Sequence, residues 1–191
     1  MGAGLTLTSR YADALAFTAA AHREQTRKGT AIPYLSHLMS VSALVLEYGG
    51  DEDQAIAGLL HDAIEDQGGV AMEAQIRDRF GDRVAQIVRA CTDSDVEPKP
   101  PWRARKEAYL ATLRDKGDDA LLVSQCDKLH NATAILEDAR TIGPAIWDRF
   151  TGKRDGTIWY YQSLAAIFAE RRPGPLAERF ARTVSGLETA A

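Results

Sequence analysis

The chain has 191 residues, enough for one ordinary domain, and 23 Lys and Arg against 27 Asp and Glu give a formal net charge of −4. Hydrophobic residues make up 45% and charged residues 26%, which excludes wholesale disorder. The basic excess typical of general nucleic-acid binders is missing, so no nucleic-acid partner is expected. Two cysteines, Cys91 and Cys126, exclude a disulfide scaffold and a Cys-based zinc site.

Membrane and export signals are also missing from the sequence. No apolar run approaches the roughly 20 residues that a membrane helix needs, so no membrane partner is expected. The first ten residues, MGAGLTLTSR, do not combine a charged segment with a following apolar one, as a secretory signal does. A cytoplasmic location is therefore predicted.

Apolar residues recur at helical spacing along most of the chain and strand patterns are nearly absent, which predicts an all-α protein. Caps, glycines and prolines mark the ends of the expected helices. In chain order we expect helices from Tyr11 to about Arg27, from an N-cap at Ser36 to Gly49–Gly50, from Asp51 to Gly68–Gly69, over Met72–Phe80, Val84–Cys91, Arg103–Lys116, Asp118 to about Arg140, around Trp159–Phe168 and around Leu176–Val184.

Two proline-rich segments interrupt the helical pattern. EPKPP, residues 97–101, predicts a loop, and PGP, residues 173–175, separates the last amphipathic helix from the rest. Short connections between many helices indicate one helical bundle over residues 1–191, with residues 173–191 as a helical appendage.

Four polar residues interrupt apolar segments and are candidates for a metal site. His61 and Asp62 are adjacent in AIAGLLHDAIED, His37 lies in PYLSHL, and Asp127 lies in ALLVSQCDKLHNATAIL. Burying such groups is costly unless something pairs with them, and a divalent cation does so. A histidine-aspartate pair alone is a weak signal, because a core histidine with a capping aspartate is the more common explanation of such a pair. Two imidazoles and two carboxylates together favour Mn²⁺, Fe²⁺ or Mg²⁺ over structural zinc.

Two more acids follow the His-Asp pair at helical spacing. Glu65 and Asp66 lie four residues after His61 and Asp62, so all four side chains are expected at one end of one helix. Outside this group, His22 and His130 are expected to pack or to form supporting hydrogen bonds rather than to bind metal.

The order of His, His-Asp and Asp, with the pattern HDxxED, resembles that of the HD-domain metal-dependent phosphohydrolases. Five segments resemble the hydrolase domain of the RelA/SpoT family, and most of all its free-standing members, the small alarmone hydrolases, including the metazoan SpoT homologues. These segments are HREQTRKGTAIPYLSHL, AGLLHDAIED, RFGDRVAQIV, CDKLHNA and GTIWYYQSL. The resemblance covers about residues 10 to 170, and the five segments occur in the same order.

The resemblance implies roles for the residues that match the family's motifs. It implies metal ligation, usually of Mn²⁺, by His37, His61, Asp62 and Asp127. It implies that Glu65 and Asp66 position and activate the attacking water. It further implies substrate contacts from Arg27, Lys28, Asn131, Tyr161 and a cation at Lys153 or Arg154. Without the resemblance, Arg27 and Lys28 would be interpreted as basic residues at a helix end.

The activity implied is hydrolysis of the 3′-pyrophosphate of guanosine (p)ppGpp alarmones, which yields GDP or GTP and pyrophosphate. A small nucleotide is then the expected partner. Alternatives of the same fold are a (p)ppApp hydrolase, a nucleotidase or an NADPH phosphatase. A metal-bound nucleotide sensor without turnover belongs to a different class, and the Glu65–Asp66 pair argues against it. The sequence leaves the oligomeric state open.

Overall fold

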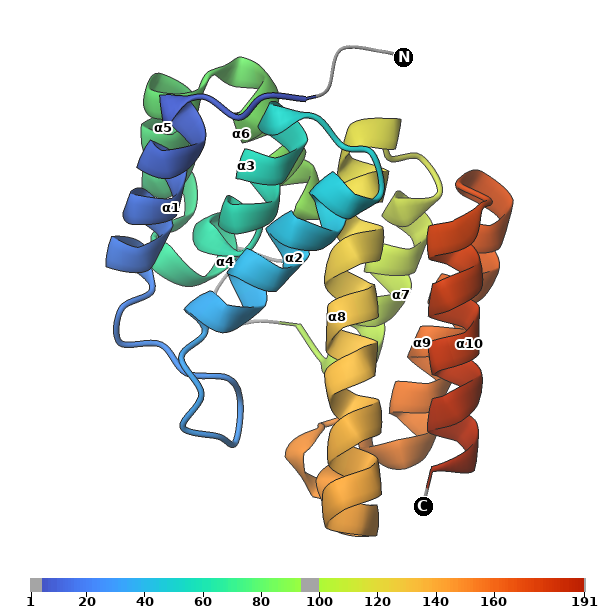
Figure 1. The fold of residues 1–191 in the computed structure, drawn as a ribbon. Helices are drawn as coiled ribbons and strands as arrows, with labels where there is room; N and C mark the ends of the chain where they lie inside the picture. Colours follow the sequence, from blue (N-terminus) through green and yellow to red (C-terminus); the bar gives the residue numbers. More distant parts are fainter. Residues whose placement is uncertain (1–4, 94–99, 191) are drawn as a thin grey trace.

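The structure is a computed structural model that describes residues 5–93 and 100–190. The predicted all-α fold is confirmed: these residues contain no strand, and one isolated β-bridge joins Thr26 and Pro33. The helices, shown in Figure 1, are α1 (Ser9–Ala21), α2 (Leu35–Glu47), α3 (Glu52–Leu60), α4 (Ala63–Gln67), α5 (Gly69–Phe80), α6 (Asp82–Cys91), α7 (Trp102–Leu113), α8 (Asp118–Ile142), the 3-10 helix η1 (Gly143–Arg149), α9 (Lys153–Arg171) and α10 (Pro175–Thr189).

The long helix α8 is the centre of the bundle (Figure 1). Its 25 residues span about 37 Å, and it packs against α2, α3, α6, η1 and α10. Because helices contact it from several directions, α8 buries polar residues as well as apolar ones. Gln125 and Asp127 are both buried in this helix. A buried carboxylate at the centre of the fold needs a partner, and the site below provides one.

Helices α2 and α3 approach each other closely at Gly58. A Cβ atom at this glycine would lie 3.0 Å from Cα of Ser42 in α2, so a larger residue would push the helices apart. The Ser42 hydroxyl donates a hydrogen bond of 2.8 Å to the carbonyl of Ala55 across the same contact. This packing brings His37, near the start of α2, close to His61, just after α3.

The start of α3 agrees with the sequence. Asp51 is its N-cap, and Asp51 and Gln54 form a reciprocal capping box. The end of the first helix differs, because α1 stops at Ala21 rather than near Arg27. Residues 22–34 form a loop that is closed by the Thr26–Pro33 bridge.

The segment expected as one helix after Asp51 is interrupted. Helix α3 ends at Leu60 and α4 begins at Ala63, so His61 and Asp62 form the connection between them. Asp62 has φ −100° and ψ −2°, and its carboxylate accepts a hydrogen bond from the Tyr34 hydroxyl.

At the C-terminal end, α10 packs against α8 and α9 and buries Leu176, Phe180, Val184 and Leu187. Of the expected loop at residues 97–101, positions 97–99 lie outside the described residues, and Pro101 is the N-cap of α7. In the part of the chain that the structure describes, no helix has both the length and the apolar character needed to cross a membrane.

Candidate metal centre and substrate cavity

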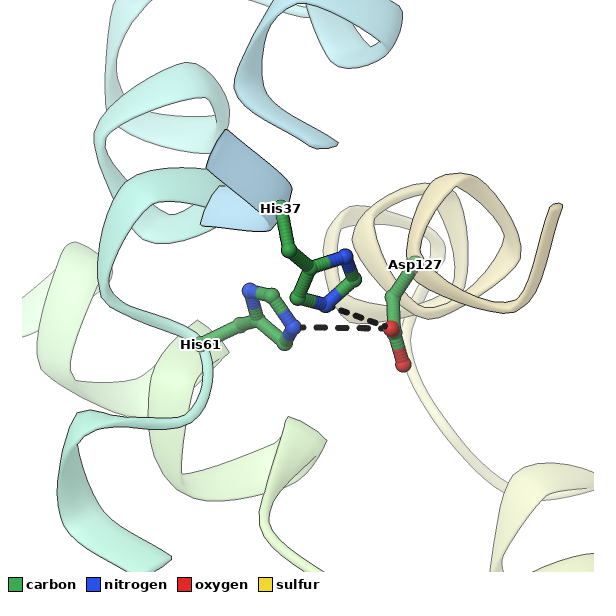
Figure 2. Close-up of side chains that lie close together, drawn as sticks. All are labelled: His37, His61 and Asp127. Atoms are coloured by element: carbon green, nitrogen blue, oxygen red, sulfur yellow. Dashed lines mark ion pairs between the residues drawn. The ribbon is translucent and has the colours of Figure 1, made fainter. Parts of the chain in front are cut away.

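Three side chains from separate parts of the chain converge in the interior (Figure 2). The Nε2 atom of His37 lies 3.2 Å, and that of His61 3.5 Å, from Oδ1 of Asp127. One ligand atom from each of the three lies within 4.8 Å of the others. All three residues are buried, with exposed fractions of 1%, 2% and 5%. The arrangement is a candidate metal-binding triad.

The ring nitrogens of the two histidines fit a divalent metal. Nδ1 of His61 lies 2.8 Å from the Gly58 carbonyl, which fixes the ring proton on that nitrogen. Nε2 of His61 and Nε2 of His37 are buried without a hydrogen-bond partner. Buried polar atoms are nearly always satisfied, so two such atoms facing one carboxylate mark a place for a bound cation.

The surrounding carboxylates also favour a positive charge here. Although burial lowers it, Asp62 and Asp127 raise the pKa of His61 well above its usual range. Oδ2 of Asp62 lies 3.1 Å from Nε2 of His61 and 3.8 Å from Nε2 of His37. The structure thus brings together all four side chains that the sequence indicated as candidate ligands.

Asp127 is also held by two residues of its own helix. Nζ of Lys128 lies 2.6 Å from Oδ2, and Nδ2 of Asn131 donates a hydrogen bond of 2.6 Å to Oδ1. Burial opposes ionisation, but Lys128 and the two histidines hold the pKa of Asp127 well below its usual range. The carboxylate is therefore ionised, as a metal ligand must be.

Glu65 and Asp66 lie in the first turn of α4, directly after the ligand pair. Oδ2 of Asp66 accepts a hydrogen bond of 2.8 Å from Gln25, and burial raises the pKa of Asp66. The negative charges of Asp62 and Glu65 raise this pKa further. Oε2 of Glu65 accepts a hydrogen bond of 3.3 Å from the backbone N–H of Asp93. A carboxylate of raised pKa beside a ligand is suited to proton transfer.

A cavity of about 520 Å³ adjoins the triad. Tyr34, Lys128 and Asn131 line it, and each also contacts a candidate ligand, so these three residues separate the cavity from the cluster. Its walls carry six cations against two acids, Glu137 and Asp138. The cations are Arg27, Lys28, Arg105, Lys106, Lys128 and Arg149. An acidic protein thereby presents a local concentration of positive charge, which attracts a polyanion.

The predicted substrate contacts divide into two groups. Arg27, Lys28, Asn131 and Tyr161 all line the cavity. Arg154 does not, because its guanidinium donates a hydrogen bond of 2.8 Å to the backbone carbonyl of Glu188 at the end of α10. Lys153, the other cation considered at this position, pairs with Asp148 at 2.8 Å.

Four of the cavity cations were not indicated by the sequence. They are Arg105, Lys106, Lys128 and Arg149. Lys128 could have been found, since it follows Asp127 directly. The other three come from α7 and η1, and only the packing of these elements against α8 and α9 brings them to the cavity.

The fold and the site define an all-helical protein with a buried His-Asp cluster beside a cationic cavity. The chain belongs to the HD domain family, whose pattern matches residues 14–158.

Among curated proteins, the chain is similar to guanosine-3′,5′-bis(diphosphate) 3′-pyrophosphohydrolases. The protein of that name from Aquifex aeolicus is 42% identical over 116 residues, which cover 60% of this chain but 16% of the relative. The Drosophila melanogaster enzyme MESH1, of the same name, is 29% identical over 143 residues, covering 73% of this chain and 75% of the relative. The chain thus spans a small part of the long relatives and most of the short one.

Two solved structures share the fold. A metazoan orthologue of SpoT, described as hydrolysing ppGpp, superposes with a TM-score of 0.77 at 24% identity, covering 97% of this chain and 99% of the other. A protein from Listeria monocytogenes superposes with a TM-score of 0.69 at 28% identity, covering 78% of this chain and 96% of the other.

Proposed function

We propose that this protein is a metal-dependent hydrolase that removes the 3′-pyrophosphate of guanosine (p)ppGpp, releasing GDP or GTP and pyrophosphate. The observation that carries the proposal is the position of the buried triad beside a cavity with six cations, to which Tyr34, Lys128 and Asn131 connect it. Long and short relatives that bear the name of this activity support it.

The cavity cations would bind the phosphate groups. Arg27, Lys28 and Arg149 approach from the loop before α2 and from η1, whereas Arg105 and Lys106 approach from α7. Arginine guanidinium groups bind phosphate oxygens in a fork, and lysines add point charges. Cations on several walls suit a nucleotide that carries phosphates at two positions of its ribose.

His37, His61, Asp62 and Asp127 would hold the metal, and we propose Mn²⁺ because mixed imidazole and carboxylate ligands suit it. When bound, such a metal polarises a phosphoryl oxygen and lowers the pKa of water. The chain's own contribution is to direct Nε2 of His61 toward the site and to keep the Asp127 carboxylate ionised. The Gly58 carbonyl does the first by contacting Nδ1 of His61, and Lys128 does the second by pairing with Asp127.

Asp66 and Glu65 would orient the attacking water and accept its proton. Water attacks the phosphorus that is bonded to the ribose 3′ oxygen, that P–O bond breaks, and the 3′ oxygen takes up a proton. The raised pKa of Asp66 fits a group that accepts a proton and then returns it. The Tyr34 hydroxyl, which donates to Asp62, holds that carboxylate while the proton moves.

The test is a substrate panel with the purified protein and Mn²⁺. Guanosine 3′,5′-bis(diphosphate), its adenosine analogue, NADPH and a nucleoside monophosphate are incubated separately, and products are separated by chromatography. We expect GDP and pyrophosphate from the guanosine substrate, released faster than products from the others. Preferred turnover of the adenosine compound or of NADPH would replace the proposed substrate. Tight binding without product would indicate a nucleotide sensor.

A further inference from the structure

Arg27 is joined to two candidate metal ligands through two neighbouring residues of α8. Its NH1 nitrogen lies 3.4 Å from Nδ1 of His130, and that same Nδ1 lies 2.8 Å from Nδ1 of His37. Its NH2 nitrogen donates a hydrogen bond of 3.1 Å to Oδ1 of Asn131, whose Nδ2 donates to Asp127. A cation of the cavity and two ligands of the triad therefore share supports.

The backbone of Arg27 is fixed independently of α8. Its N–H donates to the Ile32 carbonyl at 2.9 Å, and its carbonyl accepts hydrogen bonds of 3.0 Å from the N–H and the hydroxyl of Thr30. The Thr26–Pro33 bridge closes the same turn. The backbone bonds do not fix the long side chain of Arg27, so its contacts with α8 decide where the guanidinium lies.

His130 receives two donors at one ring nitrogen. If Nε2 of His37 faces a metal, the ring proton of His37 is on Nδ1, which must then donate to Nδ1 of His130. The Arg27 guanidinium, which has only donors, approaches the same acceptor. His130 is not a lining residue of the cavity described above, and it is not a member of the triad. It can influence ligand binding only through the residues it touches.

We infer that His130 is a positioning residue that holds the ligand His37 and the cavity cation Arg27 through one ring nitrogen. The inference rests on the proposed function in taking a metal at His37 and an anion at Arg27. Removing this acceptor leaves the N–H of His37 without its partner and lets the guanidinium move. Metal affinity and anion affinity then both fall, although His130 touches neither ligand.

Two substitutions separate this role from simple packing. His130→Leu fills space but removes the acceptor, whereas His130→Asn places an amide oxygen, which has two lone pairs, near the position of Nδ1. Dissociation constants are measured by titration calorimetry for Mn²⁺ alone and for inorganic pyrophosphate with Mn²⁺ present. We expect His130→Leu to weaken Mn²⁺ binding about 10- to 100-fold, the usual effect of losing a ligand's hydrogen-bond partner, and to weaken pyrophosphate binding as well. We expect His130→Asn to remain close to the wild type.

A double-mutant cycle tests the path through Arg27. If His130 acts on pyrophosphate through Arg27, then His130→Leu adds little to the loss already caused by Arg27→Ala. Lys28→Ala is the matched control, since Lys28 is the neighbouring cavity cation and comes from the same loop. The loss of pyrophosphate binding caused by Lys28→Ala should add fully to the loss caused by His130→Leu.

Three results would overturn the inference: unchanged constants in His130→Leu, equal losses in the Leu and Asn variants, or full additivity with Arg27→Ala. If the Leu variant fails to fold in a thermal melt, His130→Gln replaces it, because Gln places its amide near Nε2 and should show the same losses. Both titrations are independent of turnover. If the proposed substrate is wrong, the wild-type protein will fail to hydrolyse it but will still bind Mn²⁺ and pyrophosphate, and the comparison with the His130 variants remains valid.

Discussion

His61 and Asp62 are consecutive residues, yet Nε2 of the first lies 3.1 Å from Oδ2 of the second. Within a regular helix, adjacent side chains diverge by about 100°. The interruption between α3 and α4 at these two residues allows both side chains to face one point. The break in the helix is thus a requirement of the site rather than a defect in the fold.

Replacing Asp62 should abolish metal binding. Asp62→Ala removes a carboxylate from beside both Nε2 atoms. We expect metal content and hydrolysis to fall by more than about 100-fold, because losing a ligand costs more than losing a residue that only hydrogen-bonds a ligand. Elemental analysis of the purified variant measures this. Asp115→Ala, at an exposed carboxylate between α7 and α8, is the control. Unchanged stoichiometry in Asp62→Ala would refute the metal site.

The acid pair of α4 should be needed for turnover but not for binding. In the double variant Glu65→Gln with Asp66→Asn, we expect Mn²⁺ and pyrophosphate to bind normally. Hydrolysis should fall about 10²- to 10⁴-fold, the usual contribution of general acid–base catalysis. Calorimetry and single-turnover assays separate the two effects. Loss of metal would assign the pair to metal ligation, and retained turnover would remove it from the mechanism.

Arg27 and Arg154 should differ in their effect on KM. Arg27 lines the cavity, so Arg27→Ala should raise KM about 10- to 100-fold, the range for a charged hydrogen bond, with kcat largely retained. Arg154 contacts the Glu188 carbonyl instead, so Arg154→Ala should leave KM unchanged. Steady-state kinetics on both variants measure this difference. A raised KM in Arg154→Ala would restore the substrate contact that the family resemblance implied.

Gly58 should be intolerant of a side chain. Gly58→Ala places a Cβ atom 3.0 Å from Cα of Ser42, and the backbone of α2 cannot yield as a flexible side chain does. We expect the free energy of unfolding to fall by about 1–3 kcal/mol in urea denaturation. Gly117→Ala is the control, because no atom lies within 4 Å of its added Cβ, and we expect a change below about 1 kcal/mol. Equal effects would show that the helix contact is not tight.

Helix α10 should contribute to the stability of the whole domain. Phe180 is fully buried, and its ring packs edge-on against Phe168 with centroids 5.2 Å apart. We expect Phe180→Ala to lower the free energy of unfolding by about 3–5 kcal/mol, against about 0.5 kcal/mol or less for the exposed Arg182→Ala. A small effect of Phe180→Ala would mean that residues 173–191 are a dispensable appendage.

Much of the helical order could be predicted because its signals are local. The apolar spacing indicated most of the helices, and Asp51 marked the start of α3. The candidate ligands could also be found from the sequence, since an ionisable residue in an apolar helix needs a compensating partner wherever the helix packs. Asp127 in the buried middle of α8 is the clearest example.

Contacts between distant segments decided the rest. The end of α1 at Ala21 is followed by the Thr26–Pro33 bridge, and the break at His61 lies beside the Tyr34–Asp62 hydrogen bond, and both contacts join residues that local propensity does not relate. The sequence by itself determined the helical class and the chemistry of the cluster, because spacing and burial cost are properties of short segments. Only the tertiary structure decided which cations face the cavity, because that depends on how α7 packs against α9 and how η1 packs against α8 and α9.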